Sequence, residues 1–145
     1  MTSVTFLHGA VDRIQAAAEW LSKPVDGGRA VLVFVPSADD RQRLDRLLWT
    51  QPSTGFTAHC SSDDRLAGET PIVLASALDD PIHDDCLLNL SDDVPSGFNR
   101  FRQLVEIISV DDRDRLPGRA RFRFYREHGY PLRSDDISMG ISTHG

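Results

Sequence analysis

The chain has 145 residues, of which 40% are hydrophobic and 26% are charged, and its formal net charge is −6. These proportions are ordinary for one globular domain that is long enough to bury a core of its own. The acidic total argues against a protein that binds nucleic acid indiscriminately, because such domains are basic.

Nothing in the sequence indicates a membrane or secreted protein. The longest apolar run, Ala30–Pro36, is far too short to cross a bilayer, and the first residues lack the basic and apolar regions of a secretory signal. The two cysteines, Cys60 and Cys86, fit no metal-ligand spacing and no disulfide framework. We therefore expect a cytoplasmic protein with both thiols reduced.

The first half of the chain alternates short apolar runs with segments of helical period. The apolar runs predict strands over Val4–Leu7 and Ala30–Val35. The segments of helical period predict one helix from Asp12 to about Lys23 and a second helix, capped by Ser37 or Asp39, that ends near Trp49. The run Ala30–Val35 is apolar throughout, which is typical of a central parallel strand buried on both faces. Two strand–helix units in succession imply a parallel, doubly wound sheet.

The second half begins with a loop-rich stretch, Thr50–Thr70, and then returns to short elements. It predicts strands over Pro71–Ala75, Cys86–Leu90 and Leu104–Val110, and a short helix over Phe98–Arg102. The segment from Asp111 predicts a last helix that starts either at Asp111 or near Pro117 and ends at Gly129. The residues from Ser134 to Gly145 have no periodicity, so we expect one domain over 1–133 and a flexible tail over 134–145.

Several pairs of neighbouring aspartates follow predicted strands by a few residues. They are Asp39-Asp40, Asp79-Asp80, Asp92-Asp93 and Asp111-Asp112. Carboxylates at strand ends could hold Mg²⁺, as in a Mg-dependent phosphohydrolase. Each pair also looks like a turn or a helix cap, and the histidines and serines form no ligand or nucleophile motif. We expect no catalytic site, no metal and no cofactor, and keep the phosphohydrolase as an alternative.

The segment from Arg100 to Arg133 reverses the charge of the chain, with nine arginines against five acidic residues. Its arginines at 115, 119, 123 and 126 recur at the spacing of one helix face, with Phe122 and Tyr125 beside them. A charged helix face is usually only solvated. Arginine beside an aromatic ring, however, suits a carboxylate that neighbours an apolar or aromatic side chain. Stacked single-stranded nucleic acid is the competing ligand.

Two further aromatic residues lie where periodic core packing does not require them. Trp49 ends a predicted helix, and Phe56 follows a loop rich in proline, serine, threonine and glycine. They can fold back over the edge of the sheet, or they can form an exposed patch that anchors a protein partner.

Four segments together resemble the chi subunit of bacterial DNA polymerase III. They are Leu44–Trp49, Phe56–His59, Pro71–Leu74 and, above all, Gly118–Leu132, and they span nearly the whole chain up to Leu132. With the elements above, the resemblance implies a Rossmann-like, doubly wound, three-layer α/β sandwich with a mostly parallel sheet of about five strands. It also implies an accessory subunit with no catalytic activity of its own.

The resemblance further implies partners and the residues that meet them. Chi subunits pair with the psi subunit, which tethers them to the clamp loader, and bind the acidic, Phe-terminated C-terminal tail of single-stranded DNA-binding protein. Trp49 and Phe56 match the psi-facing positions, a surface that can also receive an accessory helicase. The tail-binding pocket is matched by Arg115, Arg119, Phe122, Arg123 and the apolar wall residue Ile108. DNA would then be reached only through the binding protein.

Overall fold

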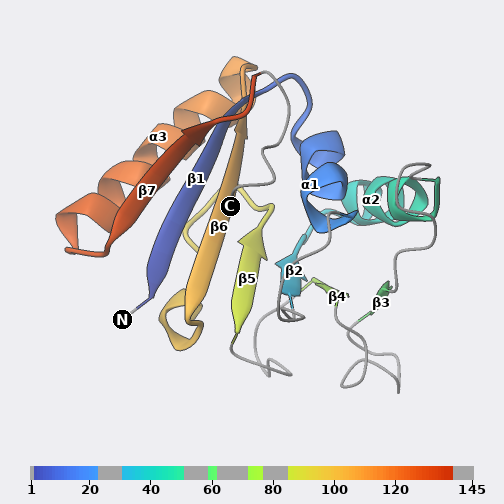
Figure 1. The fold of residues 1–145 in the computed structure, drawn as a ribbon, viewed down its shortest axis with the longest axis horizontal. Helices are drawn as coiled ribbons and strands as arrows, with labels where there is room; N and C mark the ends of the chain where they lie inside the picture. Colours follow the sequence, from blue (N-terminus) through green and yellow to red (C-terminus); the bar gives the residue numbers. More distant parts are fainter. Residues whose placement is uncertain (1, 23–30, 51–58, 62–71, 77–84, 139–145) are drawn as a thin grey trace.

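The computed structural model describes residues 2–22, 31–50, 59–61, 72–76 and 85–138 of the chain (Figure 1). In chain order the elements are β1 (Ser3–Ala10), α1 (Arg13–Ser22), β2 (Val31–Phe34), α2 (Ala38–Thr50), β3 (His59–Ser61), β4 (Ile72–Ala75), β5 (Cys86–Asn89), the 3-10 helix η2 (Phe98–Arg100), β6 (Gln103–Ser109), α3 (Asp112–Glu127) and β7 (Leu132–Asp136). No helix in these ranges is long and apolar enough to cross a membrane.

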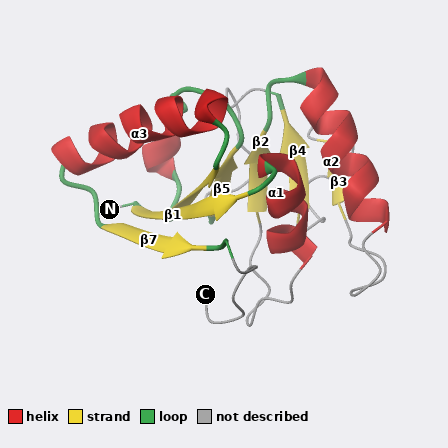
Figure 2. Cartoon of the chain, turned by 90° about the horizontal axis from the view of Figure 1, so that it is seen from above, coloured by secondary structure: helices red, strands yellow, loops and turns green. Residues whose placement is uncertain are grey.

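The strands form one sheet in the order β3-β4-β2-β5-β6-β1-β7, and every neighbouring pair is parallel. Residues of α1 and α2 pack on one face of the sheet, and residues of α3 pack on the other (Figure 2). The predicted fold class, a doubly wound three-layer α/β sandwich, is confirmed. Within the described residues the sheet has seven strands, where about five were expected.

The two additional strands are the edges of the sheet. β3 lies in the stretch predicted to be a loop, and β7 includes the first residues of the predicted tail, so the prediction that the tail starts at Ser134 is wrong. β7 has little β-forming sequence, and it is held by the backbone of β1: Val4 N–H donates to the carbonyl of Pro131 (2.9 Å), and Ile137 N–H donates to that of His8 (2.8 Å). Residues 139–145 lie outside the described ranges.

The central strands are buried on both faces because helices cover both. In β2, Val31 and Val33 pack with α1 and α2, whereas Leu32 packs with the residues on the α3 side. β1 alternates in the same way, with Phe6 toward α3 and Leu7 toward α1. The prediction that the apolar run after Ala30 is a central parallel strand is therefore confirmed.

Helix α3 begins at Asp112, so of the two starts that the sequence left open, the one at Asp111 is nearly right and the one near Pro117 is wrong. The carboxylate of Asp111 caps the helix by accepting the backbone N–H of Arg113 at 3.0 Å. Pro117 lies inside the helix, where its missing N–H is tolerated because the cap and the packing of the helix on the sheet fix the turns on either side. Gly129, at a φ of 77°, ends the helix as predicted.

A buried carboxylate fixes α3 on the sheet. Glu106 of β6 is fully buried and accepts hydrogen bonds from Arg121 Nε (3.1 Å), from the hydroxyl of Tyr125 (2.7 Å) and from Asn89 Nδ2 (2.9 Å). Arg121 also donates to the carbonyl of Asp92 (2.9 Å). A buried charge is stable only with such partners. The pKa of Tyr125 is raised far above its usual range, mainly by burial and to a smaller extent by the neighbouring carboxylate of Glu106. The hydroxyl of Tyr125 therefore stays protonated and remains a donor.

Tyr125→Phe should lower the free energy of unfolding by about 1.5–3 kcal/mol, because Glu106 would stay buried and lose a donor. Urea unfolding followed by circular dichroism measures this change. Tyr130→Phe is the matched control: the Tyr130 ring packs on Phe98 at 5.1 Å, and among the described residues its hydroxyl has no hydrogen-bond partner. Equal losses in the two variants would contradict the role given to Glu106.

Candidate functional site

A groove of about 510 Å³ opens between α3 and the strands β6, β1 and β7. Its volume is in the range of pockets that hold small ligands. One wall consists of Arg115, Gly118, Arg119, Phe122, Arg123 and Arg126 of α3. The strands supply the rest of the lining. It comes from Ile108 and the two residues after it, from Phe6 and His8 of β1, and from Ser134 of β7. Figure 1 shows α3 beside β1 and β7, with β6 next to β1.

The helix sends these side chains into the groove because they recur three and four residues apart. The adjacent face of α3 carries Gly118, Arg121 and Tyr125, which are buried against the sheet. Tyr125 was predicted to lie beside the arginine stripe, but it is buried in the core. Because Arg121 and Tyr125 are held by Glu106, the rotation of the helix is fixed and the arginine stripe faces the groove.

The floor of the groove depends on a close approach between α3 and β6. A Cβ atom on Gly118 would lie 2.6 Å from Cδ1 and 2.9 Å from Cγ1 of Ile108, so only glycine leaves room for that side chain. Phe122 packs edge-on against Phe6, with ring centroids 5.1 Å apart. The result is an apolar floor of Ile108, Phe6 and Phe122 below a row of guanidinium groups.

The arginines of the stripe differ in their partners. Arg115 pairs with Asp112 on the same helix. Among the described residues, Arg119, Arg123 and Arg126 form no ion pair, and all three are exposed. The guanidinium of Arg126 lies over the ring of Phe122, 6.0 Å from its centroid. The groove therefore offers three uncompensated positive charges next to an apolar surface, a combination that suits an anion with an apolar or aromatic neighbour.

All five residues predicted for a binding pocket line this one groove: Ile108, Arg115, Arg119, Phe122 and Arg123. Arg126 also lines the groove and belongs to the same stripe, but it was not among the predicted pocket residues. Phe6, His8 and Ser134 lie on other strands, and nothing in the sequence links them to α3. The second predicted surface, the aromatic pair Trp49 and Phe56, falls largely outside the described residues. Phe56 is not described, and for Trp49 the structure describes only the backbone, which belongs to α2.

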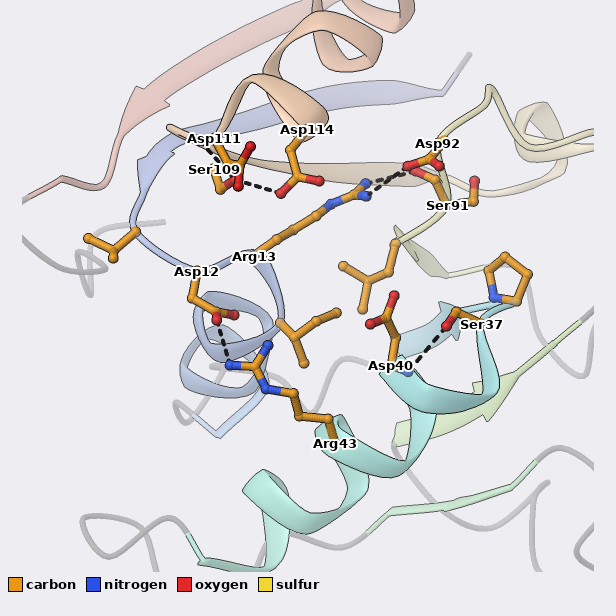
Figure 3. Close-up of a pocket in the computed structure, with 14 residues that line it drawn as sticks. Asp12, Arg13, Ser37, Asp40, Arg43, Ser91, Asp92, Ser109, Asp111 and Asp114 are labelled. Carbon is orange, nitrogen blue, oxygen red and sulfur yellow. Dashed lines mark hydrogen bonds and ion pairs between the residues drawn. The ribbon is translucent and has the colours of Figure 1, made fainter.

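A second cavity, of about 300 Å³, lies at the carboxyl ends of the strands (Figure 3). Of the aspartate pairs considered as metal ligands, Asp40, Asp92 and Asp111 reach it. Its charges are largely engaged: Asp12 pairs with Arg43, Asp111 caps α3, and Asp114 accepts a bond from the Ser109 hydroxyl. In the part of the chain that the structure describes, no three acidic, histidine or cysteine side chains are placed to hold a metal ion.

Comparison with known proteins decides the family. Residues 1–133 match the family model described as the DNA polymerase III chi subunit, HolC. The chain belongs to this family. It is 30% identical over 120 residues to the DNA polymerase III subunit chi of Pseudomonas aeruginosa, covering 83% of each chain. The chi subunits of Haemophilus influenzae and Escherichia coli are each 25% identical, over 84% and 81% of this chain and 82% and 77% of their own. The resemblance found in the sequence is confirmed, and with it a place in DNA replication.

Gly118→Ala should destabilise the chain by about 1 kcal/mol or more, because the new methyl group overlaps Ile108, and this outweighs the better helix propensity of alanine. Thermal and urea unfolding measure the loss. Ile108→Val removes the Cδ1 atom that the new methyl would meet. The double variant should therefore lose less than the sum of the two single losses. Additive losses would show that the two side chains do not meet.

Proposed function

We propose that this chain is a non-catalytic adaptor of the DNA polymerase III holoenzyme that binds the acidic C-terminal tail of single-stranded DNA-binding protein in the groove beside α3. One observation carries the proposal. Residues from a helix and from separate strands meet around one groove that combines an apolar floor with three arginines that form no ion pair with any described residue. A peptide that ends in phenylalanine presents the matching chemistry, a carboxylate next to an aromatic ring.

In the proposed complex, the terminal carboxylate meets Arg119 and the phenylalanine ring lies against Phe122 and Ile108. Hydrogen bonds between a guanidinium and a carboxylate are charge-assisted and can be bidentate, so they fix the orientation of the chain end. The apolar floor adds affinity through the area removed from water. Because the arginines are exposed, their attraction is screened by salt, and the complex should be weak and salt-sensitive.

A second surface is proposed for the psi subunit, through the aromatic residues Trp49 and Phe56. Large aromatic side chains are frequent anchors of protein interfaces, because they bury much area at little entropic cost. Through psi the adaptor would reach the clamp loader, and the same surface could receive an accessory helicase. DNA would be contacted only through the binding protein.

Two other functions receive less support. Direct binding of single-stranded DNA would use the same arginines and Phe122, but the chain as a whole carries a charge of −6, which repels a phosphate backbone. A Mg-dependent phosphohydrolase would need convergent carboxylates, and at the strand ends Asp12 and Asp114 are already engaged. A gel shift with an oligonucleotide alone, and thermal unfolding with and without Mg²⁺, test these two alternatives.

Arg119→Ala should weaken binding of a labelled acidic, Phe-terminated peptide about tenfold or more at low salt, because the terminal carboxylate would lose its charged donors. Fluorescence anisotropy at low and high salt measures the affinity. Arg113→Ala is the control, since Arg113 is exposed on the same helix but does not line the groove. Affinity that responds neither to salt nor to Arg119→Ala would remove the basis of the proposal.

Trp49→Ala combined with Phe56→Ala should abolish co-purification with the psi subunit and leave peptide binding unchanged, because the two surfaces are separate in the proposal. Pull-down of psi and anisotropy with the peptide, on the same preparation, measure both properties. Retained co-purification, or loss of both properties in a folded variant, would contradict the assignment of these two residues.

A further inference from the structure

The cavity of about 300 Å³ lies where the chain leaves two neighbouring strands toward opposite faces of the sheet. β1 and β6 are adjacent and parallel, but α1, which follows β1, packs on one face, whereas α3, which follows β6, packs on the other. The two connections therefore diverge and leave a crevice at the carboxyl ends of these strands. Such a topological switch point is the usual position of a ligand in an open α/β sheet.

The lining of this cavity is acidic. Five aspartates and two arginines contribute to it, a formal charge of −3, and they come from the segments after β1, β2, β5 and β6 (Figure 3). The carboxylates of Asp40 and Asp92 accept no hydrogen bond from any described residue. Among the described residues no three such side chains converge as metal ligands do, so the free carboxylates suit an extended organic cation better than a metal ion.

A buried arginine points into the same cavity. Arg13 is only 8% exposed, and it donates from Nε to the carbonyl of Ile107 (2.8 Å) and from Nη2 to those of Asn89 (3.1 Å) and Ser91 (2.9 Å). Its Nη1 makes no hydrogen bond to a described residue, because Oδ1 of Asp92 is 3.9 Å away, too far for one. A donor on a buried side chain that is left without a bond indicates a ligand that also brings an acceptor.

The rim of the cavity is apolar on one side. Val11 lines the cavity and is 88% exposed, and Val110 is 58% exposed. The N–H of Val110 donates to the carbonyl of Ala10 at 2.8 Å, so the two valines follow the ends of neighbouring strands. Exposed apolar side chains beside a charged cavity favour a protein surface as the occupant, since a free amino acid would leave them uncovered.

We propose that this cavity receives a lysine or arginine residue of a protein partner, with its backbone carbonyl at Arg13 Nη1, its cationic side chain between Asp40 and Asp92, and an apolar neighbour on Val11. A simple anion would be repelled by the aspartates, and a simple amine would leave Arg13 without an acceptor. The proposal does not depend on the function proposed above, because the groove beside α3 is lined by arginines and would repel a basic segment.

The first experiment compares ligands that differ in one group. An acetylated and amidated Gly-Arg-Val peptide is titrated into the ¹⁵N-labelled chain, and a matched peptide carries citrulline, which keeps the shape of arginine and removes its charge. We expect saturable amide shifts at Val11–Ile14, Ser37 and Ser91–Asp92 with the arginine peptide, and about three- to fivefold weaker binding of the citrulline peptide. Equal affinities, or shifts centred on the groove beside α3, would overturn the proposal.

Two smaller ligands test the other parts of the proposed contact. Butylguanidine has the cationic group without a peptide carbonyl, so it should bind more weakly than the arginine peptide. Free arginine should also bind more weakly, because it has no apolar neighbour for Val11. If butylguanidine binds as tightly as the peptide, the role given to Arg13 is wrong. If free arginine binds more tightly, the occupant is a free amino acid and the assignment to a protein partner is wrong.

The second experiment uses controls that the chain itself provides. Asp40 and Asp92 each have an exposed neighbouring aspartate, Asp39 and Asp93, that does not line the cavity. We expect Asp40→Asn and Asp92→Asn each to weaken binding of the arginine peptide about three- to fivefold, and Asp39→Asn and Asp93→Asn to change it by less than about twofold.

The citrulline peptide checks that these losses come from the cation. With that peptide the effects of Asp40→Asn and Asp92→Asn should disappear, because the pair of opposite charges is already absent. Thermal unfolding of the four variants confirms that each is folded. Equal losses in the two cavity variants and their neighbours would show that only the overall charge of the chain matters, and the proposed site would fall.

Discussion

The structure depends on one buried interaction, the carboxylate of Glu106 with the donors that surround it. Arg121, Tyr125 and Asn89 bring together α3, β6 and the end of β5 around a charge that is removed from water. Such a group destabilises a fold strongly when a partner is lost, because the remaining charge is left without compensation. The same contacts fix the rotation of α3 about its axis. The position of every exposed side chain on that helix, including the arginines of the groove, follows from this constraint.

The groove illustrates how a helix can separate a structural role from a binding role. On the buried face, the charge of Arg121 is engaged by Glu106 and stabilises the fold. On the neighbouring face, Arg119, Arg123 and Arg126 remain without an ion pair among the described residues and keep their charge available to a ligand. Gly118 stands between the two faces, where the missing side chain lets Ile108 reach the floor. Charge and apolar surface thus meet in one place on a chain whose total charge is negative.

Much of this architecture could be predicted from the sequence, because apolar runs and helix-breaking residues report local structure directly. The central strands, the end of α3 at Gly129 and the joint placement of Ile108, Arg119 and Phe122 were predicted. The edge strand β7 was not, because backbone bonds to β1 hold it and its side chains carry no strand pattern. The start of α3 was left open between Asp111 and Pro117, because the sequence alone does not show that the cap at Asp111 and packing on the sheet outweigh the proline inside the helix. Arg121 is buried because its partners, Glu106 and the carbonyl of Asp92, lie on other elements, whereas Arg126 is exposed and has no ion pair among the described residues. Spacing along the helix does not distinguish these two arginines.

The central claim, that the groove beside α3 is the binding site for an acidic, Phe-terminated peptide, is tested most directly by mapping amide chemical shifts of the ¹⁵N-labelled chain during titration with that peptide. The account predicts the largest shifts at residues that line the groove, from Phe6 to Gly9, at Ile108, along Arg119–Arg126 and at Ser134. Shifts centred instead on the cavity around Asp12, Arg43 and Asp92, or no saturable shifts at all, would contradict it.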